Sequence, residues 1–301
     1  MKVLITGYKY FSKSLASDLQ KYDVDNQYIY IDPTLNFMEK IKLFFSIIAV
    51  DKLFIIGGCI NNSKVVDIAL FFKKDIFMEW VGTDVINAKK DYMSGIKNEK
   101  YINEIKHCCE INWIRQELLE IGISAAICDI VRVDEEIIID KSNVKNNTIV
   151  AFTYVGKNRE EFYGIKNILK LAKLYPEIEF RICGTDGKNI KRSENIVFLG
   201  WVNNMGDEFK KCSVFLRFVE HDGLAFSVIE ALNLKKWVLY SQPFEHTYSY
   251  SSFNELVKSF DRIIKKILNG ESNCKGKKYV LNRYGKNKVL NNIVQMLKGI
   301  N

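Results

Sequence analysis

Two acidic residues eight positions apart, Asp222 and Glu230, bracket the segment whose residue types and spacing best suit chemistry. The segment reads DGLAFSVIE, so Gly223 opens a turn and the apolar run 226–232 continues as a helix into a core. Such a helix start exposes backbone N–H groups and the positive end of the helix dipole, which suit a phosphate or diphosphate. A carboxylate one or two turns along can accept two hydrogen bonds from a ribose cis-diol. The spacing therefore favours recognition of a nucleotide sugar.

The polar side chains in this segment and just before it also have structural alternatives. Asp222 is expected either to cap the helix or to contact the sugar, and both roles can hold together. His221 is either a substrate contact or an ordinary loop residue. Glu230 lies in an apolar run and Arg217 closes an apolar strand, so each is expected to have a partner, because an unpaired buried charge is costly.

The elements that must position these residues follow from hydrophobic patterning. Short β-branched and aromatic runs alternate with helical patterns, which predicts an α/β protein with parallel sheets. A turn-rich acidic stretch, 134–147, divides the chain into two such series. The strands are expected at 3–6, 28–31, 53–56, 75–81 and 125–131, and then at 148–155, 179–183, 196–199, 213–218 and 237–241.

Three strands of the second series end in glycine, at Gly156, Gly184 and Gly200. Glycine lets a ligand approach the backbone at the carboxyl edge of a parallel sheet. The alternative is that each glycine only makes a tight turn between a strand and the next helix.

The segment DGLAFSVIEAL resembles the acidic-x7-Glu signature of the family 4 retaining glycosyltransferases, E-G-x-P-L-x-x-x-E followed by an alanine-rich helix. The resemblance covers most of residues 148–245. It includes NIVFLGWV, similar to the strand and turn that contact the base in that family, and FRICG at 180–184. It implies that Glu230 holds the ribose. The other donor-binding residues implied here are Gly184, Trp201, Val202, Gly223, Leu224 and Ala225.

The stretch AFTYVGKNREEFYGIKNILKLA looks like the strand, Gly-Arg turn and Lys-Gly helix start whose two basic side chains hold the donor diphosphate in the family. Gly156 and Lys157 match the turn, although Lys157 replaces the usual arginine. Tyr163 stands where lysine is usual, so the second positive charge must come from another residue or be absent. The candidates for it are Arg159, Lys166 and Arg217.

The family fold, called GT-B, places two Rossmann-like domains face to face across a cleft, with the final helix crossing back onto the first domain. The resemblance implies an acceptor-side domain at 1–138, completed by a helix at 284–301, and a donor-binding domain at 147–283. Gly7 lies where the family has a glycine loop facing the donor phosphate. Asp84, in the motif EWVGTDV, is expected to position the acceptor or to cap the following helix.

Composition limits the other functions. The 301 residues are 48% hydrophobic and 27% charged, which excludes a disordered protein, and the net charge of +8 fits several anionic partners. Seven cysteines without a CxxC pair and only three histidines indicate reduced core residues in a cytoplasmic protein and no zinc-type site. No nucleic-acid motif accompanies the charge.

The lysines of the last quarter of the chain form a solvated face or, alternatively, a peripheral contact with anionic lipid at the inner face of a membrane.

The resemblance implies a metal-independent transferase with no cofactor. It would move a sugar from a nucleotide diphosphate, with uridine a guess for the base, to a glycan or lipid-linked acceptor in cell-surface polysaccharide or glycoconjugate synthesis. Asp222 or His221 would orient the sugar, and Asp84 would serve the acceptor. The alternatives are a catalytically inert nucleotide-sugar-binding relative and, last, a nucleotide-sugar epimerase.

Overall fold

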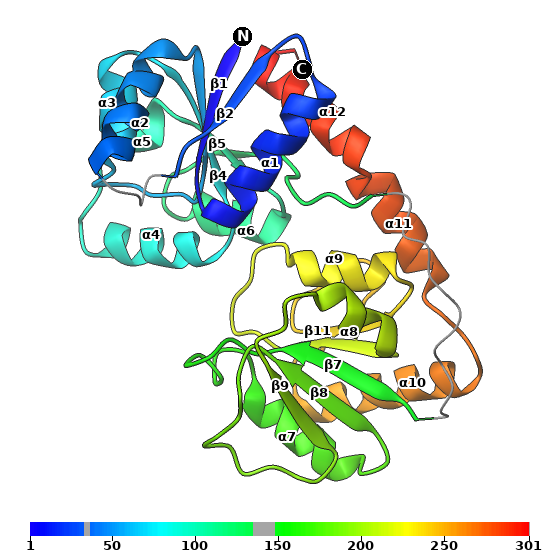
Figure 1. Cartoon of the computed structure of the whole chain (residues 1–301). Coiled ribbons are helices and arrows are strands. Elements are labelled where there is room, and N and C mark those ends of the chain that lie inside the picture. Colours follow the sequence, from blue (N-terminus) through cyan, green and yellow to red (C-terminus); the bar gives the residue numbers. More distant parts are fainter. Residues whose placement is uncertain (33–36, 135–147, 301) are drawn as a thin grey trace. The chain divides into compact units, whose positions relative to one another are not determined.

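The structure, a computed structural model, describes residues 1–32, 37–134 and 148–300 and consists of two compact units (Figure 1). Unit 1 comprises Met1–Arg132 and Lys286–Asn301, and unit 2 comprises Val133–Gly285. Except for Asp134, the linker expected at 134–147 lies outside the described residues. No helix among the described residues is both long enough and apolar enough to cross a bilayer.

Unit 1 is built on a six-stranded sheet in the order β2-β1-β3-β4-β5-β6, and all of its neighbouring strands pair in parallel. Its strands are β1 (Lys2–Gly7), β2 (Gln27–Tyr30), β3 (Lys52–Ile56), β4 (Asp75–Trp80), β5 (Lys106–Cys109) and β6 (Ala125–Ile127). Its helices are α1 (Lys9–Tyr22), α2 (Phe37–Ala49), α3 (Lys64–Phe71), α4 (Thr83–Met93), α5 (Glu99–Asn103), α6 (Asn112–Leu119) and α12 (Lys286–Lys298).

The last helix, α12, belongs to the core of unit 1. Its apolar stripe at Leu290, Ile293 and Leu297 is buried and packs in one cluster with Leu15 and Leu19 of α1. The spacing i, i+3, i+7 places these three residues on one helix face. The chain therefore returns to its first unit, as the GT-B resemblance implied.

Unit 2 is built on a five-stranded parallel sheet in the order β11-β10-β7-β8-β9. Its strands are β7 (Val150–Tyr154), β8 (Glu179–Cys183), β9 (Ile196–Gly200), β10 (Val214–Arg217) and β11 (Trp237–Tyr240). Its helices are α7 (Ile165–Leu174), α8 (Met205–Lys211), α9 (Phe226–Asn233), α10 (Phe253–Leu268) and α11 (Cys274–Tyr284). The predicted α/β class with two Rossmann-like domains is confirmed.

Two strand expectations in unit 1 were wrong. The strand expected at 125–131 ends at Ile127, because the backbone amides of Ile130 and Val131 donate to a Glu110 carboxylate oxygen, at 2.9 and 2.7 Å. The strand β5 was not expected, because its four residues begin with Lys106 and His107 and carry no β-branched side chain. A polar start hides so short a buried strand from pattern analysis.

Glu79, on β4, is a fully buried carboxyl group with no hydrogen-bond partner for either oxygen among the described residues. Burial, and then the charges of Glu110, Asp84 and Asp129, raise its pKa well above the ordinary value. A carboxyl group in this setting is held as the neutral acid, because ionising it without a partner is costly.

Replacing Glu79 by methionine, which conserves volume, should stabilise unit 1 increasingly as the pH rises. Below the pKa of Glu79 in the unfolded chain, the wild-type carboxyl is protonated in both the folded and the unfolded state. As the pH rises from there through the raised folded-state pKa, only the unfolded chain ionises readily, so the free energy of unfolding of the wild type falls. The loss is at most about 1.4 kcal/mol per pH unit. The gain in melting temperature of Glu79→Met should therefore be larger at pH 8 than at pH 5, measured by thermal unfolding.

Glu110→Met provides the matched control, because its carboxylate accepts two backbone hydrogen bonds and its loss should destabilise unit 1 at both pH values. A Glu79→Met gain that is equal at the two pH values would contradict the assignment of a neutral acid.

Candidate functional site

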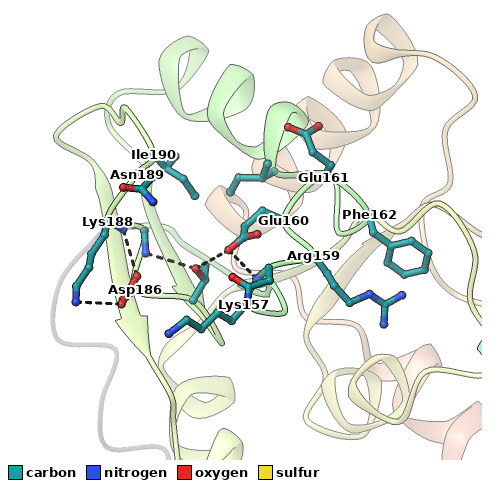
Figure 2. Close-up of a pocket in the computed structure, with 13 residues that line it drawn as sticks. Lys157, Arg159, Glu160, Glu161, Phe162, Asp186, Lys188, Asn189 and Ile190 are labelled. Carbon is teal, nitrogen blue, oxygen red and sulfur yellow. Dashed lines mark hydrogen bonds and ion pairs between the residues drawn. The ribbon is translucent and has the colours of Figure 1, made fainter.

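The carboxyl edge of the sheet in unit 2 collects the loops that follow β7, β8 and β10. Parallel strands all end at the same edge, so loops far apart in sequence meet there. A cavity of about 710 Å³ lies between the β7–α7 loop and the β8–β9 loop (Figure 2). Its lining includes Lys157, Arg159, Glu160, Phe162, Thr185, Asp186, Lys188 and Asn189.

Glu160 ties the two loops of this cavity together. Its carboxylate accepts the hydroxyl of Thr185 at 3.0 Å and the backbone amide of Asn158 at 3.2 Å. A bond from its own backbone amide and then the Thr185 hydroxyl lower its pKa, and burial opposes them only in part. Glu160 is therefore an ionised residue that connects the two loops in the wall of the cavity.

The four cations expected near the diphosphate differ in whether they are neutralised. Lys166 pairs with Glu161 at 2.8 Å. Lys157 and Arg159 form no ion pair with any described residue. Arg159 instead stacks over the ring of Phe162, 4.2 Å from the guanidinium carbon to the ring centroid, and Figure 2 shows both side chains directed away from Asp186. The fourth cation, Arg217, forms the ion pair described next.

The side chain of Arg217, at the end of β10, forms a bidentate pair with Asp222. Its Nε and Nη2 atoms donate to the two carboxylate oxygens at 2.9 and 3.0 Å, and the Tyr240 hydroxyl donates to the same carboxylate at 3.0 Å. The two charged side chains are only 12% and 14% exposed. Burial alone would lower the pKa of Arg217, but the Asp222 charge outweighs it and raises that pKa.

This pair changes the interpretation of Asp222. The N-cap residue of α9 is Ala225, without a side-chain cap, so the capping alternative for Asp222 was wrong. The arginine that ends β10 has the carboxylate partner expected from its apolar setting. His221 is half-buried beside the pair.

Glu230, one turn into α9, is a half-buried carboxylate in an otherwise apolar stretch. No described residue donates a side-chain hydrogen bond or an ion pair to it, and burial raises its pKa. The expected protein partner is thus missing from the described part of the chain. A carboxylate with free acceptor positions can receive the hydroxyls of a ligand.

Two of the glycines expected to face a ligand are required by the fold itself. Gly7 has a φ of +111°, and a Cβ atom there would lie 2.0 Å from the carbonyl oxygen of Ile56. Gly184 has a φ of +91°, and its Cβ would lie 2.5 Å from the carbonyl oxygen of Val155. Backbone packing alone therefore accounts for both residues.

The remaining donor-side candidates differ in exposure. Trp201 directly follows β9 and is 79% exposed, and Val202 beside it is partly buried. The residues Gly223, Leu224 and Ala225 are buried, and Gly223 accepts the Tyr240 hydroxyl with its carbonyl oxygen at 3.2 Å. The cavity of Figure 2 is lined by Lys157 but not by these three residues or by Glu230.

Asp84, in unit 1, is buried at the start of α4 and accepts backbone amides with both oxygens. The donors are Gly58 at 2.6 Å, Gly82 at 2.7 Å, Val81 at 3.1 Å and Val85 at 3.1 Å. Burial raises the pKa of Asp84, and the amides oppose that rise. These bonds join the loop after β3 to the loop after β4, which is a structural role.

The two parallel α/β units define the GT-B class of folds. No protein-family model matches the sequence, and no curated protein matches it. The fold, in contrast, is similar to that of several solved structures. HepE of Anabaena, in complex with UDP and glucose, is similar over 99% of this chain and 100% of its own, with a TM-score of 0.73 and 10% identity.

A glycosyltransferase from Rickettsia africae is similar over 99% of this chain and 98% of its own, with a TM-score of 0.71 and 12% identity. UDP-GlcNAc 2-epimerase from Neisseria meningitidis, bound to UDP-GlcNAc, is similar over 99% and 100%, with a TM-score of 0.59 and 15% identity. At these identities the likeness establishes the fold alone, and one fold carries more than one chemistry.

Removing Asp222 should destabilise unit 2 strongly, because Arg217 is left as an uncompensated, nearly buried cation. We expect Asp222→Ala to lose about 3–5 kcal/mol of unfolding free energy in denaturant titration. The double variant Arg217→Met/Asp222→Leu should recover much of this loss. Asp186→Ala, which removes an exposed pair with Lys188, should change stability little, and an equal loss in that variant would refute the role of the buried pair.

Proposed function

We propose that this protein is a glycosyltransferase of the family 4 type, which moves a sugar from a nucleotide-diphosphate donor to an acceptor hydroxyl with retention of configuration. The observation that carries the proposal is Glu230, a half-buried carboxylate without a partner among the described residues, at the position where the family signature holds the ribose. The GT-B fold supports it, since structures of this fold have been solved with UDP and a sugar.

The donor would lie along the carboxyl edge of unit 2. Glu230 would accept the two ribose hydroxyls, and the exposed indole of Trp201 would offer a stacking face for the base beside Val202. Uridine is the base proposed, because HepE of Anabaena has been solved with UDP-glucose.

Lys157 and Arg159 would meet the charge that develops on the leaving diphosphate. Neither has an ion-pair partner in the described chain, whereas Asp222 neutralises Arg217 and Glu161 pairs with Lys166. Cations and backbone amides already in place stabilise a leaving group without reorganisation, and this is the source of rate that we propose. The proposed reaction needs no metal ion or cofactor.

Orientation of the transferred sugar is proposed for His221 and for Asp222, which follow β10 and precede α9. Asp84 would act on the acceptor side only by fixing the loops after β3 and β4, because amides occupy its carboxylate. The acceptor proposed is a glycan or a lipid-linked sugar in cell-surface polysaccharide or glycoconjugate synthesis.

A second candidate is a protein that binds a nucleotide sugar without transferring it. Tyr163 favours it, because this ring takes the place of the family lysine and lies 5.7 Å from the Arg159 guanidinium and 5.3 Å from that of Arg217. A position that should supply a positive charge thus holds an aromatic ring between two cations. An epimerase ranks third.

Turnover assays separate these candidates. Thermal-shift measurements with a panel of nucleoside diphosphates identify the base, because a ligand that binds only the folded state raises the melting temperature. Steady, acceptor-dependent release of nucleoside diphosphate from the matching sugar donor is the result expected for a transferase. Binding without turnover over many acceptors indicates the inert protein, and conversion of the donor without release of diphosphate indicates an epimerase.

Glu230→Gln should weaken binding of the matching nucleoside diphosphate by about 10- to 100-fold, since it replaces charge-assisted hydrogen bonds to the ribose with weaker ones. Calorimetric titration measures the effect. The control is Glu177→Gln, an exposed residue at the amino end of β8, which should bind like the wild type. Full affinity in the Glu230 variant would exclude the proposed ribose contact.

A further inference from the structure

Unit 1 carries a contiguous apolar surface on α2 and on the end of α3, which lie side by side (Figure 1). We call it the aromatic patch; its residues are Met38, Ile41, Phe44, Phe45, Phe71 and Phe72. Phe45 is 62% exposed, Met38 70% and Phe71 79%. Single exposed apolar side chains are ordinary in proteins, but a contiguous group of this kind marks an interaction surface.

The rings of the patch form one chain across the two helices. Phe45 packs on Phe44 at 5.5 Å between centroids, Phe44 on Phe72 at 6.3 Å, and Phe72 on Phe71 at 5.1 Å. Each contact is an edge-to-face arrangement, the geometry that aromatic pairs prefer. The patch is therefore a joined surface rather than scattered side chains.

The core of unit 1 does not account for this surface. The inner face of α2 is buried through Leu43 and Ile47. Met38, Ile41 and Phe45 recur at i, i+3 and i+7, so they share one face, and that face points away from the core. A helix with apolar residues on both faces normally has a partner on each.

Three exposed lysines adjoin the patch in sequence. Lys40 and Lys42 alternate with its residues on α2, and Lys73 directly follows it after α3; all three are exposed. Lys42 forms an exposed ion pair with Glu39, at 3.5 Å between Nζ and Oε1, so Lys40 and Lys73 carry most of the argument from charge. Protruding aromatic tips next to long cationic side chains suit an anionic lipid surface, where the rings enter the interface and the ammonium groups meet the headgroups.

We propose that the aromatic patch docks unit 1 on a membrane surface that contains anionic lipid. The lysines decide for lipid over a second protein, because protein interfaces are depleted in lysine whereas lipid headgroups attract it. Docking through α2 and α3 differs from a contact through the lysines of α10–α12. It is independent of the reaction assigned to unit 2, so the two proposals can fail separately.

Cosedimentation with vesicles tests the patch. The full chain is mixed with vesicles of phosphatidylcholine alone, or of equal parts phosphatidylcholine and phosphatidylglycerol. We expect binding to the anionic vesicles, weakened by salt. Phe45→Ser/Phe71→Ser should weaken it by about 10-fold or more, and Lys40→Glu/Lys73→Glu by a similar factor.

Two variants serve as controls. Met93→Ser changes an equally exposed apolar residue at the end of α4, and Lys275→Glu/Lys278→Glu changes exposed lysines of α11. Both should bind vesicles like the wild type, and circular dichroism checks that every variant is folded. The proposal is overturned if the wild type ignores anionic vesicles, or if the α11 variant alone abolishes binding. It is also overturned if sedimentation velocity finds a dimer that Phe45→Ser/Phe71→Ser dissociates, because the patch would then be covered by a second copy.

Discussion

The buried ion pair between Arg217 and Asp222 fixes the turn that leads into the helix of the proposed donor site. Two nearly buried charges are tolerated only with good geometry and satisfied hydrogen bonds, and here two parallel bonds and the Tyr240 hydroxyl supply both. The pair closes the turn between β10 and α9. It also neutralises one cation near the carboxyl edge, whereas Lys157 and Arg159 have no ion-pair partner among the described residues.

Carboxyl groups of similar chemistry meet three different environments in this fold, and these environments decide what each group does. Backbone amides satisfy Asp84 and Glu110, which thereby join loops. Glu79 is buried without a partner among the described residues and is held neutral. Glu230 also has no such partner but remains partly exposed, which makes it the acidic group best placed for a ligand.

Sheet topology gives two of the predicted glycines a purely structural explanation. In a parallel sheet the chain must leave each strand at the same crowded edge. Gly7 and Gly184 lie where neighbouring backbone leaves no room for a Cβ atom, so the fold needs them with or without a ligand. Charged side chains without a partner among the described residues, such as Glu230 and Lys157, therefore support the proposed site more directly, because packing does not require them.

The sequence by itself determined the α/β class, most strands, the final amphipathic helix and the positions of Asp222 and Glu230, because these follow from local periodicity and from one short motif. It could not determine which cations are neutralised, since the partners of Arg217 and Lys166 depend on how the loops fold back. Nor could it distinguish Asp84, whose carboxylate accepts backbone amides, from Glu79, five residues earlier in the same motif, whose carboxyl group has no hydrogen-bond partner in the described part of the chain. The outward face of α2 was equally hidden, because a run of apolar residues does not reveal which of them the core will bury. Only tertiary packing makes these distinctions, since each rests on contacts between residues far apart in the chain.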